Sequence, residues 1–316
     1  MADIKETTKR KPVKLNVRKV LANESLPVFL KAGSILLGGI IISLTVIFAG
    51  RGDLNLFAGV GERNTDVTAS ECTGDNMLQD ECFPKYAKDL DLDLKKFEEC
   101  VSDEKYYSVI DDEITAGENF GVQATPTFFI GKGDGEEFKG FYMGGARYQE
   151  VDLVVQALER GSVEEAHAEF LAYLEKSLTE FEPQVREYYA SEQGGGLTGV
   201  DLDSAVSQVV DGERAKLSDE YVLKTLTAGD GVVVGDGEIV FMEFSDYQCP
   251  FCKQFAAEVL VDLKADFIDT GRARYIFRDF PLEQIHPQAR AAANAARCAG
   301  EQGKYFEYHD VLFEIN

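Results

Sequence analysis

The chain has 316 residues, 45% of them hydrophobic, a content typical of a globular protein with one or two domains. Its 56 acidic side chains outnumber 32 basic ones and give a net charge of −24. Because contacts with phosphate need a basic surface, this balance argues against nucleic acid as a partner. The excess of acidic side chains is instead typical of a solvated surface.

The first distinct feature in chain order is an apolar stretch near the N-terminus. Residues 32–50 ("AGSILLGGIIISLTVIFAG") carry no charge and are about as long as a transmembrane helix. Because basic residues dominate residues 1–31, the positive-inside tendency predicts a cytoplasmic tail there and a single-pass anchor in the cell membrane. Everything beyond the anchor is then extracytoplasmic. A cleaved signal peptide is the alternative, but the basic region is long for one.

The segment after the apolar stretch is predicted to be a linker followed by helices. Residues 51–80 are rich in Gly, Asp, Asn and Thr and predict the linker, where Cys72 and Cys82 bracket a short loop. From residue 81 to about residue 114, apolar side chains recur every three or four positions, which is typical of helices. The sequence leaves the role of Cys72 and Cys82 open.

A β-β-α unit is predicted next. Residues 127–130 and 138–143 have the pattern of strands, a turn at residues 131–135 joins them, and a helix follows at residues 148–158. Residues 161–235 are predicted to be a helical connector with a flexible linker. Its long charged helix, at residues 163–189, is interpreted as a solvated spacer.

The last segment alternates strands and helices. Strands are predicted at residues 231–235, 238–245 and 273–281, and helices at 249–263, 287–302 and 304–315. A strand, a helix and a further strand in succession predict a β-α-β unit with a parallel pair.

Six cysteines on the extracytoplasmic side of a membrane indicate disulfide chemistry, and two of them form the C-x-x-C motif in "DYQCPFC". Cys249 lies where a predicted strand gives way to a helix, and a helix N-terminus stabilises a thiolate. Pro250 suits the first helical turn, and Cys252 lies on the same face as Cys249. Zinc and a static disulfide are the alternatives. With one C-x-x-C and three scattered histidines, we expect no metal and no cofactor besides the cysteine pair.

The segment "FMEFSDYQCPFCKQF" resembles the active-site segment of the DsbA family of thioredoxin-fold oxidoreductases. The following "FRDFPLEQIHPQARAAANAARCAGEQGKYFEYHDVLFE" resembles that family's next strand and first inserted helices. The resemblance implies that Cys249 is the nucleophile, Cys252 the resolving thiol and Glu243 a buried acid beside them. An exposed strand residue is the alternative for Glu243. Phe251 replaces the histidine of the most oxidising members, so strong oxidising power is not implied.

The second signature of that family lies upstream of the dithiol. "GVQATPTFFIGK" resembles the hairpin that begins with a cis-proline and faces the cysteines. The resemblance implies a cis bond at Pro126 that presents the backbone of Thr125 to substrate. A trans proline that starts an edge strand is the alternative. We expect Thr125, Pro250 and Phe251 to contact the substrate.

The two matching segments occur in reversed order. Residues 81–160 resemble the later half of the family's domain, and residues 236–316 resemble the earlier half. The predicted architecture is therefore an α/β, thioredoxin-like (DsbA-type) fold with a helical insertion, permuted halves and one N-terminal transmembrane helix. The halves could pair within one chain or between molecules, or the sequence could be part of a longer tandem. If they pair, Cys100 and Cys298 lie on neighbouring helices of the insertion and form a structural disulfide.

The function expected from these features is a membrane-anchored, extracytoplasmic thiol–disulfide oxidoreductase. It would exchange disulfides with exported cysteine-containing proteins through a mixed disulfide at Cys249, and a membrane redox partner would renew it. The motif leaves open whether the reaction runs as oxidation, reduction or isomerisation. The alternative is a non-catalytic, membrane-tethered scaffold or truncated tandem product with a static Cys249–Cys252 disulfide.

Overall fold

The computed structural model of the chain describes residues 72, 78, 80–134, 136–191 and 194–315. The predicted cytoplasmic tail and the predicted membrane helix at residues 32–50 lie outside these residues, as does nearly all of the predicted linker. Within the described residues, no helix combines the length and the apolar character that crossing a bilayer requires.

Among the described residues, six strands form one mixed sheet in the order β3-β2-β1-β5-β6-β4. The strands are β1 (Thr127–Gly133), β2 (Glu137–Tyr142), β3 (Leu223–Thr227), β4 (Val232–Val234), β5 (Ile239–Ser245) and β6 (Ala273–Asp279). β5 and β6 are parallel, as the predicted β-α-β unit requires, and the other neighbouring pairs are antiparallel. The predicted mixture of helices and strands is confirmed.

The seam between the two predicted halves is the β1–β5 pair. Phe128 of β1 lies opposite Glu243 of β5, and Thr127 lies opposite Phe244. All seven residues of β5 are buried, so this strand needs a neighbour along each edge and a cover on each face. β1 supplies one of those edges, and both halves share one sheet within this chain.

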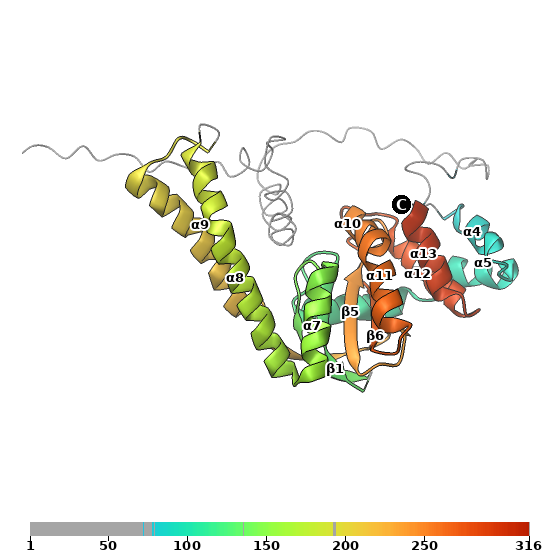
Figure 1. Ribbon diagram of the computed structural model, residues 1–316. Helices are drawn as coiled ribbons and strands as arrows, with labels where there is room; N and C mark the ends of the chain where they lie inside the picture. Colours follow the sequence, from blue (N-terminus) through green and yellow to red (C-terminus); the bar gives the residue numbers. More distant parts are fainter. Residues whose placement is uncertain (1–71, 73–77, 79, 135, 192–193, 316) are drawn as a thin grey trace, which may run out of the picture.

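Helices cover both faces of the sheet (Figure 1). One face carries α7 (Tyr148–Arg160) and a continuous helical run made of α10, η2, α11 and η3. The segments of this run are α10 (Pro250–Phe255), the π-helical η2 (Ala256–Leu260), α11 (Val261–Leu263) and the π-helical η3 (Lys264–Ile268). The other face carries α6 (Tyr107–Phe120), whose Phe120 makes edge contacts with Phe129 and Phe244.

Four further helices form a cluster at one end of the sheet (Figure 1). They are α4 (Phe83–Asp89), α5 (Leu94–Ser102), α12 (Ala289–Gly300) and α13 (Tyr305–Ile315). The first two come from the upstream segment of the chain and the last two from the downstream segment. Buried contacts between the two segments stabilise the cluster. The ring of Phe97 packs on that of Tyr308, whose hydroxyl donates to the Phe83 carbonyl at 2.9 Å.

The predicted connector contains more structure than a solvated spacer. α8 (Val163–Ala190) and α9 (Gly199–Asp219) form a helical hairpin that projects from the sheet, with an apolar core of its own around Val185, Val206 and Val210. The first turns of α8 bury Phe170 and neighbouring side chains in the main core. The interpretation as a spacer is therefore wrong for these parts of the connector.

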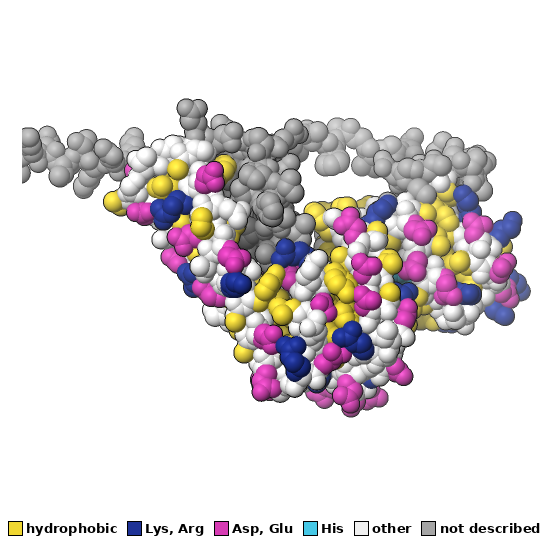
Figure 2. All heavy atoms as spheres, viewed as in Figure 1, with side chains coloured by type: hydrophobic (Ala, Val, Ile, Leu, Met, Phe, Trp, Pro, Cys, Tyr) yellow, Lys and Arg dark blue, Asp and Glu magenta, His cyan; other side chains and the backbone are white. Residues whose placement is uncertain are grey.

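The connector also supplies β3, which was not predicted as a strand. β3 pairs with β2, and its Leu226 is fully buried. Acidic and basic side chains are interspersed over α8, α9 and the body of the molecule (Figure 2), as expected of a solvated surface.

The predicted turn at residues 131–135 begins too early. β1 continues to Gly133, and Gly131 lies opposite Gly140 of β2. A Cβ added to Gly131 would lie 1.9 Å from the carbonyl oxygen of Lys139. Gly131 therefore permits a close approach of two strands, a use of glycine that looks like a turn signal in the sequence.

Candidate active site

Cys249 lies at the junction that the sequence predicted, between the end of β5 and the start of α10. It is the N-cap residue of α10 with extended backbone, and Pro250 occupies the first helical turn. Pro lacks the N–H that would be unsatisfied there, so the sequence favours a helix that begins at this point. Cys252 lies one turn further along and is fully buried, and both cysteines are free thiols.

The upstream segment supplies the wall that faces Cys249. The Thr125–Pro126 peptide bond is cis, and the Cys249 Sγ lies 3.4 Å from the Thr125 carbonyl oxygen. Thr125 is buried, and Thr127 stabilises the loop by donating from Oγ1 to the Ala124 carbonyl at 2.7 Å. The structure thus brings together the dithiol and the proline loop, which lie far apart in the sequence.

The two thiols have different acidities. The hydrogen bond with Cys252 is the largest influence on Cys249 and, with the backbone N–H groups of Phe251 and Cys252, lowers the pKa of Cys249 to about 6 although burial opposes this. Burial raises the pKa of Cys252 well above its ordinary value, and the charge of Cys249 adds to that effect. At neutral pH the site therefore favours a thiolate on Cys249 and a protonated thiol on Cys252.

Glu243 lies in β5 on the same face of the sheet as the dithiol and is 1% exposed. Burial raises its pKa to about 7, and the hydroxyls of Ser245 and Tyr275 oppose the rise. The Tyr275 hydroxyl donates to Glu243 Oε2 at 2.6 Å. The charge of Glu243 is in turn one of the influences that raise the pKa of Cys252.

The two residues between the cysteines lie at the surface. Phe251 is 53% exposed, and Pro250 is exposed as well. Both are thus accessible to a molecule that approaches Cys249, whereas Cys249 itself is 3% exposed.

The other four cysteines form two disulfides, Cys72–Cys82 and Cys100–Cys298. The structure thus joins the predicted pair Cys100 and Cys298, on α5 and α12. This bond connects positions 198 residues apart and cross-links the two segments of the helical cluster. Cys249 and Cys252 are therefore the two cysteines left as free thiols.

Sequence reasoning missed two groups near the dithiol. Tyr275, the partner of Glu243, lies on β6, and only the parallel register of β5 with β6 brings the two side chains together. His286 lies in the loop before α12, and its Nδ1 is 2.9 Å from Oδ2 of Asp246. In the sequence, His286 is one of three scattered histidines, and no local pattern connects it with Cys249.

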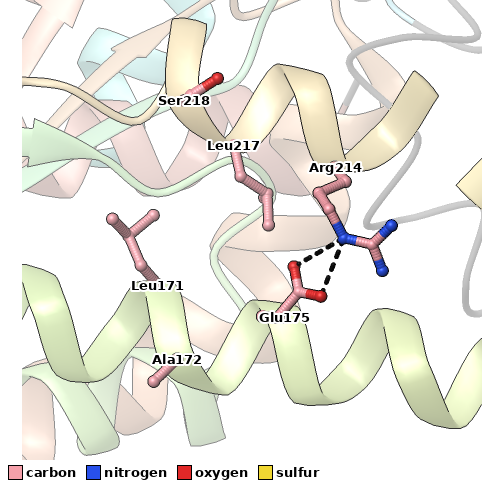
Figure 3. A pocket seen from close by; sticks show the side chains of 6 residues that line it. All are labelled: Leu171, Ala172, Glu175, Arg214, Leu217 and Ser218. Atoms are coloured by element: carbon pink, nitrogen blue, oxygen red, sulfur yellow. Dashed lines mark hydrogen bonds and ion pairs between the residues drawn. The ribbon is translucent and has the colours of Figure 1, made fainter. Parts of the chain in front are cut away.

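A pocket of about 380 Å³ lies away from the dithiol, between α8 and α9 (Figure 3). Its lining residues are Leu171, Ala172, Glu175, Arg214, Leu217 and Ser218. Arg214 and Glu175 pair across one side of it, and none of the dithiol residues lines it. In the part of the chain that the structure describes, no three His, Cys, Asp or Glu side chains are grouped as metal ligands would be.

Comparison with known proteins identifies similar chains. A family model described as "Thioredoxin" matches residues 63–140 and 227–316, together more than half of the chain. Disulfide bond formation protein D of Bacillus subtilis is 28% identical over 79 residues, which are 25% of this chain and 36% of that protein. No solved structure matches the chain.

Two further relatives are named as sodium–proton antiporters. Na(+)/H(+) antiporter NhaA 1 of Salinispora arenicola is 39% identical and NhaA 3 of Salinispora tropica is 38% identical, each over 77 residues. The aligned part is 24% of this chain and 11% of each antiporter. Because the chain spans so little of their length, these names carry no transport activity over to it.

Proposed function

The chain belongs to the thioredoxin family, and we propose that within this family it is a thiol–disulfide oxidoreductase that acts on cysteine-containing proteins. The observation that carries the proposal is the contact of the Cys249 sulfur with the carbonyl of Thr125, next to a cis proline. This contact joins a low-pKa thiol with a backbone segment that can hold a peptide. Similarity to a disulfide bond formation protein supports the same activity.

The exchange proceeds through a mixed disulfide. In the reducing direction, the Cys249 thiolate attacks one sulfur of a substrate disulfide, a new S–S bond forms, and the other substrate sulfur leaves as a thiolate. Cys252, once deprotonated, then attacks Cys249, which releases the second substrate sulfur and forms the Cys249–Cys252 disulfide. The substrate gains two electrons and the enzyme dithiol loses two. The same steps in reverse oxidise a substrate dithiol.

Glu243 serves the resolving step in this proposal. Cys252 must lose its proton before it can attack, and burial holds its pKa well above the ordinary value. The carboxylate of Glu243, whose pKa of about 7 is near neutrality, can accept that proton. Tyr275 holds the acceptor oxygen through its hydroxyl.

We further propose that the domain is DsbA-like with its halves in permuted order. The family match in two separate stretches, the β1–β5 pairing and the Cys100–Cys298 bond support this arrangement. We also propose that the N-terminal apolar stretch anchors the domain on the extracytoplasmic side of the membrane. Exported proteins are then its substrates, and a membrane redox protein is its electron partner.

The test is reduction of insulin by dithiothreitol with the full chain as catalyst, monitored by turbidity. We expect Cys249→Ser to abolish catalysis, because the nucleophile is lost, and Cys252→Ser to trap a mixed disulfide with the substrate. Serine in place of both Cys72 and Cys82 is the matched control and should retain activity. Equal activity of the wild type and Cys249→Ser would refute the proposal and favour a static scaffold.

A further inference from the structure

A network of hydrogen bonds beside Cys249 is not used by the exchange steps above. Its centre is Asp246, whose carboxylate is fully buried in the loop between β5 and Cys249. Oδ1 accepts the backbone N–H of Gln248 at 2.7 Å, and Oδ2 accepts the N–H of Leu282 at 2.7 Å. The Nδ1 of His286 lies 2.9 Å from the same Oδ2.

The network fastens the loop that precedes α12 to the loop of the nucleophile. The side chain of Gln248 donates to Gln288 Oε1 at 2.6 Å and accepts the backbone N–H of Gln288 at 2.9 Å. The Cys249 N–H donates to the Asp246 carbonyl at 3.0 Å. His286 is therefore connected to the backbone of Cys249 through a single residue, Asp246.

This arrangement has an electrostatic consequence. A buried carboxylate three residues before Cys249 disfavours a second negative charge on the sulfur, unless a cation offsets it. A protonated His286 supplies that cation. The hydrogen bond with Asp246 raises the pKa of His286, and the charges of Asp246 and Cys249 add to this effect while burial opposes it.

The other charged groups near this loop have partners of their own. Glu283, in the same loop as His286, pairs with Arg290 of α12 at 3.0 Å. Arg290 also pairs with Asp111 of α6 at 2.6 Å. The charges that act on His286 are thus those of Asp246 and Cys249.

We propose that Asp246 and His286 form a positioning pair for the dithiol, in which Asp246 fixes the imidazole and the imidazolium favours the Cys249 thiolate. When a substrate dithiol reduces the Cys249–Cys252 disulfide, the enzyme gains two electrons and the substrate forms a disulfide. The pair stabilises the reduced product, with Cys249 as thiolate and Cys252 as thiol. It therefore makes the Cys249–Cys252 disulfide more oxidising. The effect on substrate oxidation rests on the proposed function. The fraction of Cys249 present as thiolate can be measured without any substrate.

The first test is the pH dependence of iodoacetamide alkylation of the reduced full chain. Cys249 is the expected target, because it is 3% exposed whereas Cys252 is fully buried and the other four cysteines are in disulfides. We expect His286→Gln to slow alkylation at pH 6 by about three- to tenfold, because the favourable charge is lost. The control is His167→Gln on α8, where the ring contacts the Tyr221 carbonyl far along the chain from the dithiol. An unchanged profile in folded His286→Gln overturns the proposal.

The second test needs no variant. The three histidines are titrated by NMR in the reduced and in the oxidised full chain. If a protonated His286 favours the Cys249 thiolate, the thiolate must equally favour protonation of His286, because linkage is reciprocal. We expect the pKa of one histidine, which His286→Gln assigns, to be higher in the reduced chain. Identical titration of all three in both states overturns the proposal. A changed alkylation profile in a chain that fails the insulin assay supports the pair and refutes only the proposed function.

Discussion

Two buried glutamates, one on each face of the sheet, differ in what surrounds them. Glu243 and Glu113 are each 1% exposed, and burial raises the pKa of both to about 7. Glu113, on α6, forms a buried ion pair with Arg278 of β6, and Arg297 of α12 lies 4.0 Å away. Glu243 instead accepts a hydrogen bond from the Tyr275 hydroxyl, and its charge raises the pKa of the Cys252 thiol.

Burial by itself therefore does not determine the role of a carboxyl group. At Glu113 the arginines provide an opposite charge, so the group cross-links the upstream helix α6 to the downstream elements β6 and α12. At Glu243 the hydrogen-bond partner is a neutral hydroxyl, and the Cys252 thiol lies within the range of its charge. A carboxyl in those surroundings can accept and release a proton during a reaction.

The largest effect is expected from breaking the ion pair of Glu113. Arg278→Met removes the hydrogen-bonded cation from a buried carboxylate and leaves only the more distant Arg297, so we expect a loss of about 3 to 5 kcal/mol in the free energy of unfolding at pH 8. The loss should be smaller at pH 5, where Glu113 takes up a proton. Urea unfolding at both pH values measures it. Arg274→Met is the control, because Arg274 lies on the same strand and donates to backbone carbonyls. Equal losses in the two variants would contradict the comparison.

The covalent cross-link between the same segments should rank next. Replacing both Cys100 and Cys298 by serine frees a loop of 198 residues in the unfolded chain. We expect the free energy of unfolding to fall by about 3 kcal/mol. The matched control replaces Cys72 and Cys82, whose loop spans 10 residues, and should lose less because a shorter loop restricts the unfolded chain less. Thermal unfolding of both variants measures the difference. The reverse order would mean that strain or local contacts dominate.

A smaller effect is expected at Glu243 and depends on pH. Its folded pKa of about 7 exceeds the unfolded value, so the folded state binds the proton more tightly. The stabilisation is complete below about pH 4.5 and is lost as the pH rises through 7. Glu243→Gln should remove roughly 2 to 3 kcal/mol of this pH dependence, as measured by urea unfolding between pH 4.5 and 8. Glu238→Gln, at an exposed position just before β5, should leave the dependence unchanged. If Glu243→Gln kept the pH dependence of stability seen in the wild type, a group other than Glu243 would take up the proton.

The smallest effect is expected from changing Phe251, which lies at the surface between the two cysteines. Phe251→His places a titratable ring at a 53% exposed position between the cysteines. When protonated, that ring should favour the Cys249 thiolate and shift the equilibrium with glutathione toward the dithiol by up to about tenfold, or about 30 mV. Phe251→Gln is the uncharged control. An equal shift in both variants would indicate that loss of the phenyl ring, rather than charge, is responsible.

Local chemistry explains which parts of the site could be predicted. The strand before Cys249, the proline after it and the spacing to Cys252 are neighbours in sequence, so their geometry follows from helix initiation. Tyr275 and His286 could not be found in this way. Their contacts with Glu243 and Asp246 depend on strand register and on loop packing. The strand β3 was missed for the same reason, since its burial depends on pairing with β2.

Local sequence patterns were enough to predict the dithiol at a helix start, the proline loop in "ATPTFFI" and most of the strands and helices. Periodicity and turn chemistry act over a few residues, so a linear pattern carries them. Long-range contacts bring the two segments into one sheet, which places the Thr125 carbonyl oxygen 3.4 Å from the Cys249 sulfur. Long-range contacts also give Glu113 two arginines as ion-pair partners and place Glu243 where its charge acts on the Cys252 thiol. The physical reason is that burial and ion pairing depend on distances between residues that lie far apart in the sequence. The pairing of β1 with β5 sets these distances.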